Sequence, residues 1–120
     1  MINRLSEQAL KNILKGKTKE SFKCVIKFYS NKCHYCHKLK NDYVNISKQF
    51  SDNVHFFAFN TFESDNLDDL ISINGVPSIA FVKVQARPEV SILNDPSNPS
   101  EETWYHPEDI IRFVEDNLYD

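Results

Sequence analysis

Apolar residues recur at helical spacing in several parts of the chain. This periodicity predicts helices over residues 6–15, 34–50, 67–73 and 107–118. Ser6 is a suitable N-cap and Gly16 a suitable stop for the first helix, and Pro107 is expected to occupy the first turn of the last. The residues expected to face the core include Ala9, Leu10, Ile13, Leu14, Leu39, Tyr43, Ile46, Phe50, Ile110, Ile111, Val114 and Leu118.

Short apolar runs rich in β-branched and aromatic residues predict strands between these helices. They cover residues 23–29, 54–62 and 78–84, with an edge strand at residues 2–5, an alternating segment at residues 89–93 and a last strand near residues 103–105. The order of elements predicts an α/β fold with a mixed central sheet of four to five strands, flanked by helices on both faces. No repeat or linker interrupts the chain, so residues 1–120 are expected to form a single domain.

Composition narrows the class of protein. The net charge of −3 gives no basic footprint for nucleic acid. No apolar run approaches the roughly 18 residues needed to span a bilayer. The first twenty residues lack the continuous apolar core of a secretory signal, so a cytoplasmic protein is expected. An abundance of Asn, Lys and Ile is typical of AT-rich genomes and fits a phage protein in its host's cytoplasm or a protein of an AT-rich bacterium.

The run Cys33-His34-Tyr35-Cys36-His37 is compatible with three chemistries. C-x-x-C-H attaches c-type haem, cysteines with nearby histidines bind zinc, and a C-x-x-C between a strand and a helix forms a redox dithiol. Haem is disfavoured because the only methionine, a usual second axial ligand, is Met1. A structural zinc site needs four ligands, and this run supplies three. The position of the run between a predicted strand and a predicted helix favours the dithiol.

Four features together resemble the thioredoxin superfamily over nearly the whole chain. They are the strand VIKFYS leading into Cys33 and Cys36, the strand FFAFN, the loop Gly75-Val76-Pro77-Ser78, and the closing helix PEDIIRFVEDNL. The resemblance implies a thioredoxin-like fold in which Pro77 follows a cis peptide bond and lies against the dithiol. It also implies that Gly75, Val76 and Pro77 form the loop that meets the backbone of a substrate.

The resemblance further implies a thiol–disulfide oxidoreductase that exchanges its Cys33–Cys36 dithiol with protein disulfides. Cys33 would be the nucleophile, since a helix N-terminus favours thiolate, and Cys36 would resolve the mixed disulfide. The redox-active disulfide would be the sole prosthetic feature, with no separate cofactor and no bound metal. Electrons would come from a thioredoxin reductase or glutathione, and the protein is expected to act as a monomer.

The chain departs from the family pattern around the dithiol. Lys27 replaces the family's buried acid, and Lys32 replaces an aromatic neighbour of the first cysteine. Lys27 has two interpretations: a lysine whose head reaches solvent at the sheet end, or a cation beneath the dithiol that stabilises thiolate. His34 and His37 are likewise either solvated or thiolate-stabilising, while Tyr35 is expected to form a contact surface. These cations predict a dithiol more oxidising than that of ordinary thioredoxin.

Two other functions stay open at the level of sequence. The fold could serve as a binding module or a subunit of a larger complex in which the dithiol is incidental. Metal binding by the C-x-x-C-H run is the third alternative. The remaining thiol, Cys24, falls within a strand pattern and is expected to belong to the core.

Overall fold

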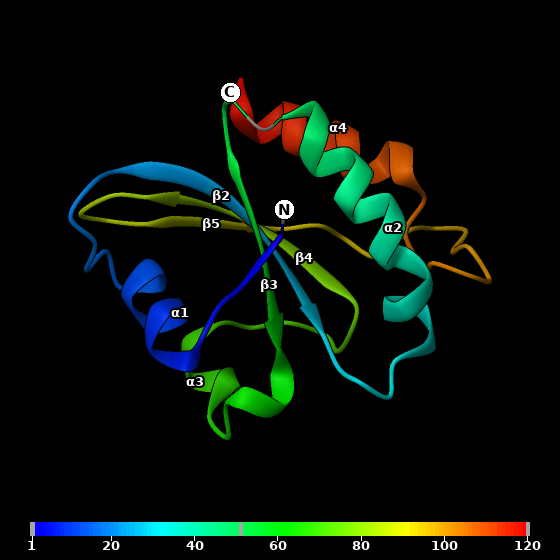
Figure 1. Ribbon diagram of the computed structural model, residues 1–120, viewed down its shortest axis with the longest axis horizontal. Coiled ribbons are helices and arrows are strands. Elements are labelled where there is room, and N and C mark those ends of the chain that lie inside the picture. The colour runs from blue at the N-terminus through cyan, green and yellow to red at the C-terminus, as the bar shows by residue number, and fades with distance from the viewer. Residues whose placement is uncertain (1, 51, 120) are drawn as a thin grey trace.

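A mixed sheet with helices on both faces organises the chain in a computed structural model, which describes residues 2–50 and 52–119 (Figure 1). The strands are β1 (Asn3–Arg4), β2 (Phe22–Tyr29), β3 (His55–Asn60), β4 (Ser78–Val84) and β5 (Glu89–Ile92). The helices are α1 (Glu7–Leu14), α2 (His34–Gln49), α3 (Leu67–Leu70) and α4 (Pro107–Leu118), with a 3-10 turn, η1 (Thr61–Glu63). Across the described residues, no helix is both long enough and apolar enough to cross a membrane.

The sheet has the order β1-β3-β2-β4-β5, which places β2 at its centre. Strands β1, β3 and β2 run parallel, whereas β4 is antiparallel to both β2 and β5. The predicted α/β fold with four to five strands is therefore confirmed, and the sheet contains five. The edge strand expected at residues 2–5 is present as β1.

The two faces of the sheet carry separate apolar clusters. Side chains alternate along a strand, so Val25 packs towards α2 and α4 while Cys24 and Ile26 pack towards α1 and α3. Cys24 is completely buried, which confirms its assignment to the core, and burial raises the pKa of its thiol to about 12. Alternation thus decides which side chains of β2 face α2, the helix that begins at the cysteine pair.

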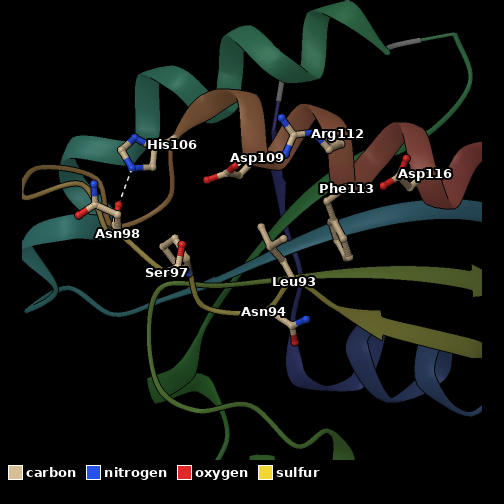
Figure 2. Close-up of a pocket in the computed structure, with 10 residues that line it drawn as sticks. Leu93, Asn94, Ser97, Asn98, His106, Asp109, Arg112, Phe113 and Asp116 are labelled. Atoms are coloured by element: carbon tan, nitrogen blue, oxygen red, sulfur yellow. Dashed lines mark hydrogen bonds and ion pairs between the residues drawn. The ribbon is translucent and has the colours of Figure 1, made fainter.

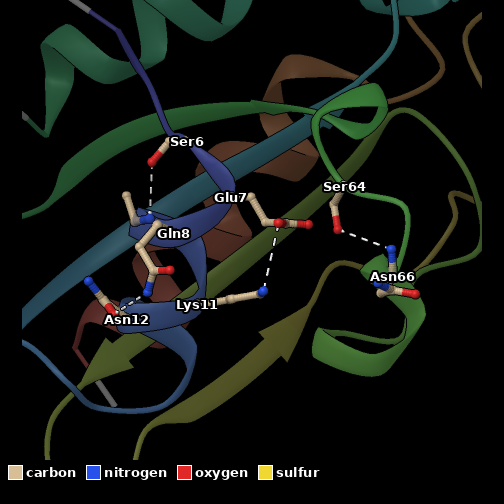
Figure 3. A network of polar contacts seen from close by, with 8 residues as sticks. Ser6, Glu7, Gln8, Lys11, Asn12, Ser64 and Asn66 are labelled. Carbon is tan, nitrogen blue, oxygen red and sulfur yellow. Dashed lines mark hydrogen bonds and ion pairs between the residues drawn. The ribbon is translucent and has the colours of Figure 1, made fainter.

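The ends of α1 follow its sequence signals. The Oγ of Ser6 accepts a hydrogen bond of 3.1 Å from the backbone N–H of Ala9, which confirms the predicted N-cap. Glu7 and Lys11 approach to 3.7 Å one turn apart, and Ser64 beside them lowers the pKa of Glu7 (Figure 3). Gly16 ends this segment in a left-handed conformation, with φ of +69°.

Two predicted elements end earlier than their apolar pattern suggests. The strand expected at residues 54–62 ends at Asn60, whose side-chain oxygen accepts from the N–H of Phe62 and starts η1 instead. The helix expected at residues 67–73 spans only Leu67–Leu70, and its N-cap Asn66 makes no side-chain capping bond. The cap at Asn60 thus ends the strand, and the extended backbone of Ile71 ends the helix at Leu70.

The prediction of a last strand near residues 103–105 is wrong. This segment forms a turn in which Ser100 and Trp104 make a single isolated bridge. Trp104 has a left-handed φ of 65°, which interrupts an extended conformation. The hydroxyl of Thr103 bonds the carbonyl of Tyr105 at 2.8 Å and further closes the turn.

We predict that the chain's two glycines differ sharply in their tolerance of alanine. Both have positive φ, but a Cβ on Gly16 would overlap the carbonyl oxygen of Gln85, whereas one on Gly75 would meet nothing within 4 Å. Gly16→Ala should therefore lower the free energy of unfolding by about 2–4 kcal/mol, and Gly75→Ala by about 1 kcal/mol. Urea denaturation of both variants measures the difference. Equal losses would show that the close approach at Gly16 contributes nothing beyond backbone strain.

Candidate redox site

The cysteine pair lies at the junction between the central strand β2 and helix α2. Strand β2 ends at Tyr29, and α2 begins directly after Cys33, which is its N-cap. The Sγ of Cys33 accepts a hydrogen bond of 3.1 Å from the backbone N–H of Cys36. The two cysteines form a disulfide, and they are only 9% and 4% exposed. The pair is thus a disulfide-capable site at a helix N-terminus, where the helix dipole and free N–H groups favour negative charge.

The loop before β4 lies at the same edge of the sheet. Ser78, the first residue of β4, pairs with Phe28 near the end of β2, so Gly75, Val76 and Pro77 lie beside the segment that leads to Cys33. The Val76–Pro77 peptide bond is cis. The hydroxyl of Ser78 donates to the carbonyl of Gly75 at 2.6 Å and closes the loop. Gly75 and Val76 remain at least partly exposed, while Pro77 is buried.

Lys27 is buried beneath α2. Its side chain is 5% exposed, and its Nζ lies 5.0 Å from the ring centroid of Tyr43 and 5.7 Å from that of Tyr29. Burial, together with the nearby charge of Lys40, lowers the pKa of Lys27 to about 8. Lys27 and Cys36 line the same cavity. Lys27 is nearly covered, so only a small part of its side chain reaches solvent, at the cavity that it lines with Cys36.

The other residues expected to tune the dithiol lie at its surface. Lys32, His34 and His37 are exposed, and Tyr35 is partly buried. The ring Nε2 of His37 lies 2.8 Å from the carbonyl oxygen of Asn31, which holds this ring against the turn that precedes α2. The ring of His34 packs edge-on against the ring of Tyr35, with 5.9 Å between the two ring centroids. Of these four residues, His37 alone lines the cavity that also contains Lys27 and Cys36.

Trp104 is a site residue that the sequence reasoning did not identify. Its ring lies 5.5 Å from that of Tyr35, and its Nε1 donates to a carboxylate oxygen of Asp95 at 3.2 Å. The chain's single tryptophan therefore stands beside the dithiol helix, although it follows Cys36 by almost seventy residues. The available signal was a lone tryptophan directly before the closing helix. The strand predicted at residues 103–105 hid this signal, because a strand would not place a residue with positive φ, such as Trp104, in a turn beside α2.

Cavities of similar size lie at separate places on the molecule. The cavity beneath the dithiol, with a volume of about 420 Å³, is bounded by α2 and the carboxyl ends of β1, β2 and β3. A second pocket, of about 410 Å³, lies between the segment after β5 and α4, and Leu93, His106, Arg112 and Phe113 help to line it (Figure 2). None of the predicted site residues lines the second pocket. In the described parts of the chain, no three His, Cys, Asp or Glu side chains are grouped as metal ligands would be.

The comparisons with known proteins point in one direction. The family model described as Thioredoxin matches residues 2–101. A thioredoxin of Borreliella burgdorferi (strain ATCC 35210 / DSM 4680 / CIP 102532 / B31) is 28% identical over 68 residues, which is 57% of this chain and 58% of that protein. The match therefore spans little more than half the length of that relative.

Solved structures of low sequence identity share the fold. The J-Trx1 fragment of ERdj5 superposes with a TM-score of 0.71 at 16% identity, covering 99% of this chain and 52% of that one. Chloroplastic thioredoxin z gives a TM-score of 0.70 at 14% identity, covering 99% and 96% of the two chains. A chain from a study of thiol resolution in yeast mitochondrial 1-Cys peroxiredoxin gives 0.67 at 16% identity, covering 96% and 94%. At these identities the similarity establishes the fold alone.

We predict that Lys27→Met stabilises the oxidised protein in a pH-dependent way. The pKa of Lys27 falls from 10.5 to about 8 on folding, so the folded state binds fewer protons than the unfolded state between these values. Wild-type stability therefore rises with pH across that window, and the burial cost applies in full below it. The variant should gain about 1–3 kcal/mol near pH 7, and its advantage should shrink towards pH 10.5.

Denaturant unfolding of wild type and variant at both pH values measures this effect. The matched control is Lys48→Met, an exposed lysine near the end of α2, which should change stability little at either pH. If Lys27→Met were destabilised throughout, the contacts of Nζ with the Tyr29 and Tyr43 rings would outweigh the cost of burial.

Proposed function

This chain belongs to the thioredoxin family, and on that premise we propose that it is a thiol–disulfide oxidoreductase acting on protein disulfides. The observation that carries the proposal is the disulfide between Cys33 and Cys36 at the N-terminus of α2. The cis-proline loop at the same edge of the sheet supports it, because Gly75 is exposed and Val76 partly exposed, so that this segment can meet an extended substrate there.

In the reductive direction the reaction begins from the dithiol. The thiolate of Cys33 attacks one sulfur of a target disulfide, the target S–S bond breaks, and the departing sulfur takes up a proton. The N–H of Cys36, which bonds the Cys33 sulfur at 3.1 Å in the disulfide, supports the thiolate before attack.

Resolution needs the second cysteine. Cys36 loses its proton and attacks the Cys33 sulfur of the mixed disulfide, which releases the second target sulfur as a thiol. The target has then gained two electrons and two protons, and the protein holds the Cys33–Cys36 disulfide. Two electrons from a thioredoxin reductase or from glutathione would restore the dithiol.

The surface around the site suits a protein substrate. Tyr35 and Trp104 form an aromatic pair beside the dithiol, and the loop of Gly75, Val76 and Pro77 lies at the same sheet edge. A target chain could lie between them with its disulfide over Cys33. We propose that the protein acts in this way as a monomer in the cytoplasm, which would be the host's cytoplasm for a phage protein.

We predict that reduction of insulin disulfides, with dithiothreitol as electron donor, depends on both cysteines of the pair. Cys33→Ser should abolish turnover because it removes the nucleophile. Cys36→Ser should lower turnover strongly because it removes the resolving thiol, and when the reduced variant is mixed with insulin after dithiothreitol is removed, it should accumulate a mixed disulfide that denaturing gels detect without reductant. Cys24→Ala is the matched control, because this third thiol is completely buried on the other face of the sheet.

The outcome separates an enzyme from a binding module. Catalysis by wild type and Cys24→Ala alone would support the oxidoreductase. A double variant of Cys33 and Cys36 that matched wild type would leave the dithiol incidental and favour the binding module.

We predict a midpoint potential of about −200 to −250 mV near pH 7, above the roughly −270 mV of thioredoxin. Lys27, with a pKa of about 8, is mostly protonated at this pH and lines a cavity with Cys36. A cation stabilises thiolate and therefore the reduced form, which makes the disulfide more oxidising. Lys27→Met should lower the potential by about 30 mV for each tenfold loss of thiolate stabilisation.

Equilibration with glutathione buffers of known ratio measures both potentials. Lys48→Met serves again as the control and should match wild type. A wild-type potential at or below about −270 mV, unchanged by Lys27→Met, would mean that Lys27 has no influence on the dithiol.

A further inference from the structure

The cavity beneath the dithiol is rich in positive charge. Arg4 of β1, Lys27 of β2 and Lys40 of α2 all line its volume of about 420 Å³. No acidic side chain is among the described residues that line it. Three cations from three separate elements therefore surround one space, and the mutual repulsion of Lys27 and Lys40 contributes to the lowered pKa of Lys27.

Lys27 is the least satisfied of these groups. Only 5% of its surface is exposed, and within residues 2–50 and 52–119 its ammonium has neither an ion pair nor a side-chain hydrogen bond. Since none of the described side-chain nitrogens is both fully buried and unbonded, the small exposed part of Lys27 includes its ammonium, which faces the cavity. Its contacts are the faces of the Tyr29 and Tyr43 rings. An ammonium that is nearly covered and has no charged partner is costly, so an anion in the cavity that it faces would stabilise it.

None of the groups around Lys27 acts as its anionic partner. The hydroxyl of Tyr29 accepts from the Nη1 of Arg4 at 3.2 Å. The hydroxyl of Tyr43 lies 2.6 Å from the carbonyl of Phe57, to which it donates. The ring of His37 is held at the carbonyl of Asn31, and the sulfur of Cys36 is bound in the disulfide. None of these groups supplies a negative charge to Lys27 in the oxidised protein.

We propose that this cavity is a binding site for a small dianionic oxyanion of the sulfate or phosphate type, held by Arg4, Lys27 and Lys40. Arg4, which is exposed, offers planar, always-charged donors, and Lys27, which is nearly covered, offers a compact point charge. A bound dianion would replace the repulsion between Lys27 and Lys40 with attraction to both. Sulfate binding can be tested separately from the proposed exchange reaction, because Arg4, Lys27 and Lys40 all line the cavity while Cys33 and Cys36 are joined in the disulfide.

Sulfate is the probe that tests this site. Oxidised protein is titrated with sodium sulfate against sodium chloride at matched ionic strength, and binding is followed by NMR shifts of the Lys27 side chain and by calorimetry. Saturable shifts with sulfate and none with chloride are expected. Since sulfate keeps its charge, raising the pH from about 7 to about 9 should weaken binding about tenfold, as Lys27 loses its proton.

Variants locate the site. Lys27→Met should weaken sulfate binding about tenfold or more, and Arg4→Gln should weaken it several-fold. Lys38→Met is the matched control, since Lys38 is exposed on α2, the helix that carries Lys40, but does not line the cavity. Thermal unfolding verifies that each variant is folded. Equal effects of sulfate and chloride, or equal loss in the Lys38 and Lys27 variants, would reduce the observation to general charge screening and overturn the proposal.

Discussion

The two-sided pairing of β2 is the constraint on which the rest of the molecule depends. This strand pairs with β3 over six positions in parallel and with β4 over seven positions in the antiparallel direction. The parallel pairing puts the carboxyl ends of β2 and β3 at one edge, and the antiparallel pairing brings the start of β4 to the same edge. The cysteine pair and the cis-proline loop meet for this reason, although about forty residues separate them.

The pleat of β2 then determines the electrostatics beneath the cysteines. Because side chains alternate, Lys27 points towards α2, whereas its neighbours Ile26 and Phe28 enter the opposite cluster. A carboxylate at this position would disfavour a nearby thiolate, whereas a cation favours one. Burial limits that cation, since the same low-polarity surroundings that strengthen its field also lower its pKa to about 8. Its charge is therefore conditional on pH in a range close to neutrality.

Sequence signals predicted the structure correctly where the interactions involved join residues close together in the chain. The Ser6 cap depends on a bond to Ala9, three residues away, and the helix at 107–118 depends on its own apolar periodicity and on Pro107. The pattern Cys33-x-x-Cys36 after an apolar strand identified the candidate site for the same reason. The strand expected at residues 103–105 failed because extended conformation requires a partner strand, and Ser100 offers only one bridge.

The sequence by itself determined the order of elements, the apolar faces, the cysteine pair and the presence of a lysine where the family carries an acid. These depend on spacing and residue type along a short stretch of chain. Only the tertiary structure decided that Lys27 is nearly covered, that Arg4 and Lys40 share a cavity with it, and that Trp104 stands against Tyr35. Burial and through-space charge arise from elements far apart in the chain, and no local pattern of residues encodes them.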